Sequence, residues 1–262
     1  MPEKYRETAK VISQEQIGTG IFSMWIQTER IAEAARPGQF ISVYSADGSR
    51  LLPRPISICE AEADTGKLRI VYRVAGKGTA EFSGRGAGDT LDIMGPLGNG
   101  FPLERMSEGK KAFLIGGGIG IPPMVQLSKM LPGDKESRQI VVGYRDELFL
   151  TEDLEKNGTL YLASEDGKHG TKGNVLDCIR ENGLQADVIY ACGPTPMLRA
   201  LKEYTEENQI ECWLSLEEKM ACGIGACLAC VCRSKEVDDH SKVHNKRVCK
   251  EGPVFLSTEI EL

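Results

Sequence analysis

The sequence predicts a multidomain fold of the β plus α/β class. Short β-rich runs broken by Gly and Pro fill the first part of the chain, and strands alternate with helices in the middle. Five of the nine cysteines gather near the C-terminus. We therefore expect three domains: an antiparallel barrel at 1–104, a doubly wound parallel sheet at 105–216, and a small cysteine-bearing segment at 217–262.

The first region contains short apolar runs without helical periodicity. Turn residues such as Pro37-Gly38 and Gly95-Pro96 separate them. Close-spaced strands of this kind are typical of a small antiparallel barrel. The predicted strands are residues 11–13, 21–26, 40–44, 56–59, 68–74 and 91–94.

The second region alternates strands with helices. Such alternation predicts a parallel sheet whose ligands bind beyond the carboxyl ends of the strands. The predicted strands are residues 112–115, 139–144, 160–163, 187–191 and 211–216, and the predicted helices are 123–131, 151–156, 175–181 and 196–208.

Composition excludes some classes of function. The 262 residues include 32 Lys and Arg against 38 Asp and Glu, a formal net charge of −6, and no basic block suited to nucleic acid. The apolar stretches fall far short of the roughly 20 residues needed to span a membrane. The charged N-terminal stretch lacks the apolar core of a signal peptide, so we expect a cytoplasmic protein.

The C-terminal cysteines follow a spacing that suits metal ligation. An odd number of cysteines in a reducing compartment does not suggest a disulfide framework. Cys222, Cys227 and Cys230 form a C-x4-C-x2-C run that Cys249 completes, which is the ligand order of plant-type [2Fe–2S] centres. Zinc is the alternative, although zinc sites favour short paired spacings.

Two loops of the α/β region are candidates for binding a nucleotide. Gly118 and Gly120 lie in a glycine loop between a strand and a helix, where a pyrophosphate can approach the backbone. A plain tight turn is the alternative. Cys192 and Gly193 end the fourth strand at the same edge of the sheet, so Cys192 is a candidate to face a nicotinamide.

The barrel carries a third constellation. Two arginines on a half-buried strand face need anionic partners, and a cofactor diphosphate satisfies both. Ser57 is a candidate donor to a flavin ring, and Tyr72 offers an aromatic face. Ion pairing at the surface is the alternative for the arginines. The candidate residues are Arg54, Pro55, Ile56, Ser57, Val71, Tyr72, Arg73, Gly78 and Thr79.

The order of these parts resembles a known family. The R-P-I-S run at 54–57, the glycine loop and the C-G-P run at 192–194 are similar to the ferredoxin–NADP reductase superfamily. The tail, with MACGIGACLAC at 220–230 and VCKEGPVF at 248–255, resembles the electron-transfer subunits of class 1B dihydroorotate dehydrogenases.

The resemblance implies a Greek-key barrel that holds FAD on the residues named above, and an α/β domain that holds NAD near Gly118, Gly120, Cys192 and Gly193. The four cysteines would ligate the [2Fe–2S] cluster. An FMN-containing catalytic subunit would be the partner, two of each chain forming a heterotetramer. Electrons from dihydroorotate would pass through FMN, the cluster and FAD to NAD⁺, in pyrimidine (UMP) biosynthesis.

Two departures from the superfamily and three alternatives stay open. The chain lacks the C-terminal aromatic residue that often covers the flavin, and Asp146 and Glu147 beside Arg145 favour NAD over NADP.

Residues 217–262 are too few for a (β/α)8 barrel of roughly 250 residues, so the dihydroorotate site belongs on another chain. The alternatives are a reductase subunit of a sulfide dehydrogenase, one of a ferredoxin–NADP oxidoreductase, and a zinc-stabilised binding module without turnover.

Overall fold

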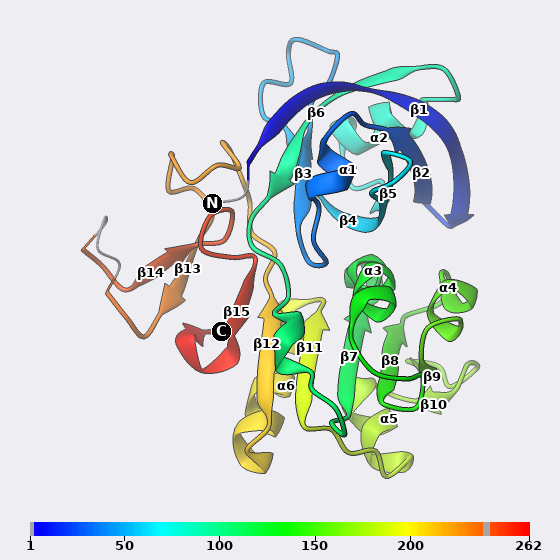
Figure 1. The fold of residues 1–262 in the computed structure, drawn as a ribbon, viewed down its shortest axis with the longest axis vertical. Coiled ribbons are helices and arrows are strands. Elements are labelled where there is room, and N and C mark those ends of the chain that lie inside the picture. The colour runs from blue at the N-terminus through cyan, green and yellow to red at the C-terminus, as the bar shows by residue number, and fades with distance from the viewer. Residues whose placement is uncertain (1–2, 238–241) are drawn as a thin grey trace.

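The computed structural model describes residues 3–237 and 242–262. A barrel and a parallel sheet stack one above the other, and the C-terminal segment lies beside them (Figure 1). Within the described residues six antiparallel strands close the barrel in the Greek-key order β1-β2-β5-β4-β3-β6. They are β1 (Tyr5–Gly18), β2 (Ile21–Gln27), β3 (Phe40–Val43), β4 (Arg54–Glu62), β5 (Lys67–Arg73) and β6 (Thr90–Leu97).

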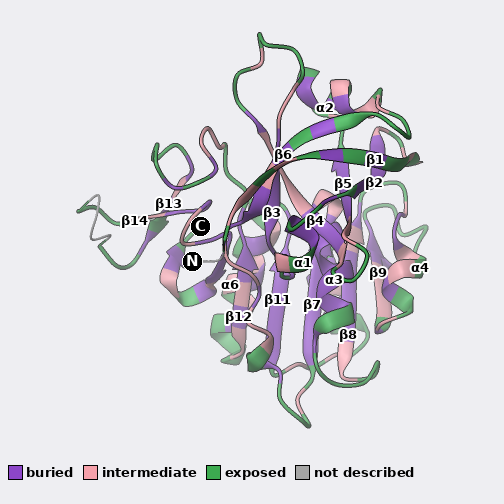
Figure 2. Ribbon diagram, turned by 45° about the horizontal axis from the view of Figure 1, so that its top comes forward, coloured by how far each residue is buried: buried purple, intermediate pink, exposed green. Residues whose placement is uncertain are grey.

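Each predicted barrel run lies on one of these strands because alternate side chains fill the barrel. Met24, Ile41 and Ile70 are fully buried there. Figure 2 shows buried segments along the barrel strands in purple. Two short helices accompany the strands, α1 (Ile31–Ala34) and α2 (Lys77–Ser83). The sequence pattern does not predict α2. It starts there because the Thr79 hydroxyl accepts hydrogen bonds from the N–H groups of Ala75 and Gly76 at 2.9 and 3.2 Å.

The second sheet contains the five predicted strands, which run parallel. Its order in the described residues is β10-β9-β8-β7-β11-β12-β15, so the strand order reverses between β7 and β11. Ligands of open α/β sheets bind at such a point. The strands are β7 (Ala112–Gly117), β8 (Arg138–Tyr144), β9 (Thr159–Ser164), β10 (Thr171–Lys172), β11 (Val188–Cys192), β12 (Glu211–Ser215) and β15 (Val254–Leu256).

Helices cover this sheet where the sequence predicts them. They are α3 (Pro122–Met130), α4 (Thr151–Glu155), α5 (Val175–Glu181) and α6 (Thr195–Asn208). Among the described residues no helix is long and apolar enough to cross a membrane.

The C-terminal segment pairs with the parallel sheet and also forms a small sheet of its own. Strand β15 extends the parallel sheet by pairing antiparallel with β12. The described part of the segment also forms a small sheet in the order β14-β13-β16, made of β13 (Val231–Ser234), β14 (Asn245–Arg247) and β16 (Ile260–Glu261). The chain after the last cysteine of the predicted cluster therefore contributes one strand, β15, to the parallel sheet and one, β16, to the small sheet.

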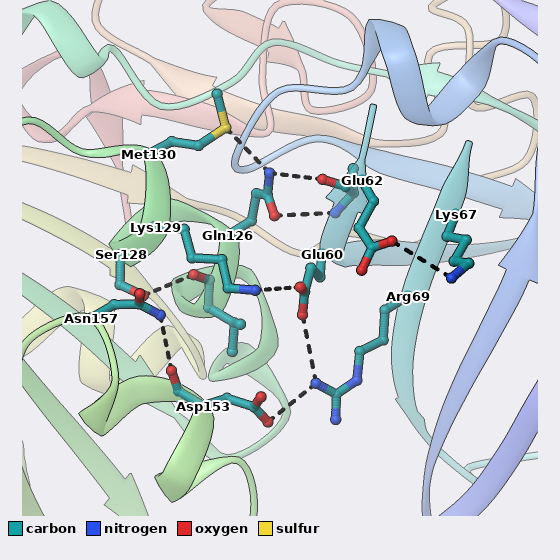
Figure 3. A network of polar contacts seen from close by, with 12 residues as sticks. Glu60, Glu62, Lys67, Arg69, Gln126, Ser128, Lys129, Met130, Asp153 and Asn157 are labelled. Carbon is teal, nitrogen blue, oxygen red and sulfur yellow. Dashed lines mark hydrogen bonds and ion pairs between the residues drawn. The ribbon is translucent and has the colours of Figure 1, made fainter. Parts of the chain in front are cut away.

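A buried polar network fixes the barrel on the parallel sheet (Figure 3). Arg69 of β5 donates to Asp153 of α4 at 3.1 Å and lies 3.7 Å from Glu60 of β4. Lys129 of α3 pairs with Glu60, and Gln126 accepts a hydrogen bond from the backbone of β4 at 3.1 Å. Arg69 and Glu60 are only 8% exposed, and each has two partners of opposite charge, so both buried charges are compensated. The network thus joins β4 and β5 of the barrel to α3 and α4 of the α/β domain.

Candidate functional site

The first candidate site is a pocket between the barrel and the parallel sheet. Eight of the nine predicted flavin residues line it: Arg54, Pro55, Ile56, Ser57, Val71, Tyr72, Arg73 and Thr79. Strands β4 and β5 position them, apart from Thr79 of α2. Cys192, from the other domain, lines the same pocket. The pocket is therefore lined by residues of both the predicted barrel domain and the predicted α/β domain.

Gly78 has a different place from its predicted companions. It lies behind Arg54, and a side chain at this position would begin 2.6 Å from the Arg54 Nε atom. Its hydrogen side chain leaves room for the guanidinium, which donates to the Leu52 carbonyl at 2.5 Å. Gly78 thus shapes the pocket through Arg54.

Tyr72 belongs to the barrel core as well as to the pocket wall. Its ring stacks on Phe22 at 6.0 Å, and its hydroxyl donates to Gln14 at 2.6 Å. Burial raises the pKa of Tyr72, so the hydroxyl stays protonated.

A second pocket lies beyond the ends of β7 and β11. The glycine loop lines it through Gly118 and Gly120, and so does Gly193. A side chain at Gly120 would begin 2.4 Å from the Cys192 carbonyl oxygen, so only glycine permits the close approach of the two loops. The loop leads into α3, and this end of a helix favours anions. Arg145, Asp146 and Glu147 also line this pocket.

Cys192 carries a neutral thiol. Burial raises the pKa of Cys192 to about 12, with a smaller contribution from the charge of Glu217, while a hydrogen bond with Ser215 acts in the opposite direction. The thiol is therefore a small neutral group on the pocket wall rather than a thiolate nucleophile.

The two pockets adjoin. Of the described residues, Arg73, Ile119 and Glu217 line both. Glu217 is the second residue after β12, and Leu216, Glu218 and Met220 of the same stretch also line the first pocket.

Glu217 is a residue that the sequence analysis missed. The residue is exposed at the shared edge of the two pockets, and partial desolvation there raises the pKa of its carboxyl. The available signal is its position just after the last parallel strand, at the edge where ligands of such sheets bind.

The four predicted cluster cysteines lie together as two pairs. Cys222 interacts with Cys227, and Cys230 with Cys249. A hydrogen bond between the two thiols lowers the pKa of Cys230 to about 6 and, together with burial, raises the pKa of Cys249. Burial alone would raise the pKa of Cys222, but hydrogen bonds from backbone N–H groups and Cys227 lower it to about 7.

Backbone N–H groups point at these sulfurs. Ile224 and Ala226 donate to the Cys222 sulfur at 3.5 and 3.3 Å, and the Cys249 N–H donates to the Cys230 sulfur at 3.4 Å. Gly223 and Gly225 make the loop possible with φ of 68° and 87°. Four thiols with N–H donors around them are the ligand set of a [2Fe–2S] cluster.

The four cysteine thiols form two pairs. Across residues 3–237 and 242–262, no three His, Cys, Asp or Glu side chains converge as ligands of one metal ion. Two separate thiol pairs instead fit a centre with two iron atoms, which takes two protein ligands at each iron.

Asn99 is a second residue that the sequence analysis missed. Its side chain donates to the carbonyls of Glu251 and Val254 at 3.0 and 2.8 Å, and its oxygen accepts from the Val254 N–H at 3.0 Å. These bonds tie the barrel to the chain just after Cys249. The available signal is the Gly98-Asn99-Gly100 turn, although its partners are far away in the sequence.

Solved structures share this architecture. An NADH-dependent reduced ferredoxin–NADP oxidoreductase is 27% identical, with a TM-score of 0.85 over 97% of this chain and 90% of that chain. A ferredoxin–NADP⁺ reductase from Neisseria gonorrhoeae, 16% identical, shares the fold with a TM-score of 0.62 over 77% of this chain and 91% of that chain. The fold and the adjoining pockets define an oxidoreductase of the ferredoxin–NADP reductase class.

Sequence comparison defines the family more narrowly. Residues 217–261 match the model for the iron–sulfur cluster binding domain of dihydroorotate dehydrogenase B. The chain is 42% identical over 260 residues to the NAD⁺-type dihydroorotate dehydrogenase B electron transfer subunits of Bacillus caldolyticus and Geobacillus kaustophilus, which covers 98% of this chain and 99% of each relative. The chain belongs to the family of dihydroorotate dehydrogenase B electron transfer subunits.

Proposed function

We propose that this chain is the electron transfer subunit of a dihydroorotate dehydrogenase. It carries electrons from an FMN-containing catalytic subunit through a [2Fe–2S] cluster and FAD to NAD⁺, in pyrimidine biosynthesis. The observation that carries the proposal is that the first pocket, which we call the flavin pocket, adjoins the second, which we call the nucleotide pocket. The same chain also bears the four cysteines.

The barrel residues would hold FAD. Arg54 and Arg73 supply positive charge for the diphosphate, and Ser57 and Thr79 supply hydroxyl groups to the pocket. When bound, FAD supplies the exchange between two-electron hydride transfer and one-electron transfer. The protein sets the position of the ring through the paired strands β4 and β5.

The nucleotide pocket would hold NAD. Gly118 and Gly120 admit the pyrophosphate, and Cys192 with Glu217 lies where the pocket meets the flavin site. Asp146 is the candidate acceptor for a ribose 2′-hydroxyl, because both carboxylate oxygens of Glu147 already accept hydrogen bonds from Thr19 at 2.6 Å. A carboxylate here would repel a 2′-phosphate.

The thiols of Cys222 and Cys227 would hold one iron atom and those of Cys230 and Cys249 the other. The N–H donors to sulfur would stabilise the negative charge that reduction adds. Cys227 is exposed, and so are its neighbours Ile224 (42%) and Leu228 (38%), so this loop is the candidate surface for the catalytic subunit.

The proposal includes a heterotetramer with two copies of each subunit, a cytoplasmic location, and the domains 1–104, 105–216 and 217–262. The nine cysteines, all within the described residues, are free, which suits a reducing compartment. The domain boundaries fall close to η1 (Leu103–Arg105) and the end of β12.

Co-purification tests the proposal. The tagged full-length chain should bring down an FMN-containing partner in about equal amount, and the complex should reduce NAD⁺ with dihydroorotate under anaerobic conditions. A yellow-brown chain that oxidises NADH with artificial acceptors, but supports no dihydroorotate-dependent activity with its partner, would refute it.

A ferredoxin–NADP oxidoreductase subunit is the second candidate, favoured by the 27% identical structure with a TM-score of 0.85. The electron donor separates the two, because the structure behind the second candidate is itself NADH-dependent. Reduction of NAD⁺ by dihydroorotate supports the first candidate, and reduction of NAD⁺ by reduced ferredoxin without any dihydroorotate-dependent activity would support the second.

A further inference from the structure

The guanidinium of Arg247 contacts the loop between Cys222 and Cys227. Its Nη1 atom donates at 3.0 Å to the carbonyl of Gly225, which lies between Cys222 and Cys227. The Arg247 backbone belongs to β14, two residues before Cys249. The residue is only 6% exposed, so one buried side chain links the first thiol pair to the strand that leads to the second.

Glu251 holds this guanidinium in place. Its carboxylate accepts from the Arg247 Nε atom at 2.9 Å, from Nη2 at 2.5 Å and from the Arg247 backbone N–H at 2.8 Å. The Arg247 carbonyl in turn accepts from the N–H groups of Lys250 and Glu251 at 3.0 and 2.9 Å. The chain therefore turns tightly around Cys249, and the buried positive charge has a fixed partner.

The same chain of contacts continues into the barrel. The Glu251 carbonyl accepts from Asn99 at 3.0 Å, and the Gly252 carbonyl accepts from the Asn99 N–H at 2.6 Å. Pro253 follows directly and lines the flavin pocket. Hydrogen bonds thus run from the Gly225 loop through Arg247, Glu251 and Asn99 to the flavin-binding barrel.

We propose that Arg247 is a positioning residue for the iron–sulfur cluster. Its guanidinium N–H groups hold the Gly225 loop at a fixed distance from Cys230 and Cys249. Glu251, which binds both Arg247 and Asn99, connects this arrangement to the barrel. This inference rests on the proposed function, because it requires a cluster on the four cysteines. Residues behind metal ligands commonly change metal affinity 10- to 100-fold when they are replaced.

The test compares full-length variants purified with their cofactors. Arg247→Gln removes the charge and the fork, whereas Arg247→Lys keeps the charge but cannot reach Gly225 and Glu251 at once. Arg180→Gln, which removes an exposed arginine 3.7 Å from Asp177, is the matched control. The readouts are FAD content, loss of iron to a chelator, and the electron paramagnetic resonance (EPR) spectrum of the reduced cluster.

We expect Arg247→Gln to lose iron about tenfold faster than the wild type and to show an altered EPR spectrum, with its FAD content unchanged. The rate of iron loss from Arg247→Lys should lie between those of the wild type and Arg247→Gln, and Arg180→Gln should match the wild type. Wild-type iron retention and an unaltered spectrum in Arg247→Gln would overturn the inference.

If Arg247→Gln does not fold, Arg247→Lys and Glu251→Gln carry the test. An altered EPR spectrum in both, with FAD retained, supports the positioning role, and an unaltered spectrum in both overturns it. A wild-type chain that binds FAD but contains no iron or acid-labile sulfide would instead refute the cluster part of the proposed function.

Discussion

Strands of the barrel contribute eight of the 19 residues that line the flavin pocket, whereas all four cysteines lie outside strands and helices, three of them in one loop. Arg54 and Ser57 are positioned by pairing with β3 and Arg73 by pairing with β2, over a core in which Ile58 and Ile70 are buried. The cysteine loop depends instead on positive-φ glycines and on a few hydrogen bonds, such as the one from Arg247. The pocket should thus keep its shape without its cofactor better than the loop keeps its own.

Loss of one cluster ligand should have the largest effect. Cys227→Ser is expected to remove the iron and the EPR signal of the reduced cluster while FAD stays bound, because the flavin pocket does not depend on this loop. Iron, sulfide and FAD analysis of the purified variant measures this.

Cys232→Ser is the matched control for that variant. Cys232 is buried on β13 and its thiol contacts the Lys246 carbonyl at 3.5 Å, a contact that serine can reproduce. It should keep both iron atoms. Normal iron content in Cys227→Ser, or its loss in Cys232→Ser, would contradict the ligand assignment.

Replacement of Arg54 should weaken FAD binding in the flavin pocket, the other region of the comparison. Arg54→Gln removes a charged donor from the flavin pocket and should cost about 1.5–3 kcal/mol of FAD binding, with little change in iron content. A flavin titration of the apoprotein measures this. Arg145→Gln, which changes an exposed arginine of the nucleotide pocket, should leave FAD affinity unaltered. Equal effects of both variants would contradict the role of Arg54.

Asn99 connects the flavin-binding barrel to the segment that follows the last cluster cysteine. Asn99→Ala removes side-chain hydrogen bonds to residues 251–254 and should destabilise the chain by roughly 1–3 kcal/mol. Faster loss of iron than of FAD during thermal unfolding is expected, because the bonds anchor the cysteine segment. Simultaneous loss of the two cofactors, as in the wild type, would argue against this anchoring role.

Glu217 should have the smallest effect, seen in pH dependence. Partial desolvation raises its pKa in the folded chain, so its contribution to stability is complete at low pH and is lost as pH rises through the folded pKa. Glu217→Gln should remove this loss and make the chain slightly more stable near neutral pH. Thermal unfolding between about pH 4 and pH 8 checks this, and identical pH profiles would contradict it.

The sequence predicts the features that rest on local patterns. Cysteine spacing, strand alternation and the glycine loop identify the four thiols, the barrel, the sheet and the second pocket. It does not predict contacts between distant segments. Asn99 meets Glu251 across 152 residues of sequence, and Arg247 meets Gly225 across 22. Helix α2 is missed because a single side chain, Thr79, organises its start.

The most direct test of the relay is an anaerobic titration of the purified full-length chain with NADH, followed by visible absorption and EPR. We predict that NADH bleaches the flavin and then produces the reduced-cluster EPR signal in the wild type, but bleaches only the flavin in Cys227→Ser. A wild-type chain whose flavin is bleached while a fully assembled cluster stays oxidised, even with excess NADH, would contradict the claim that one chain connects the two centres.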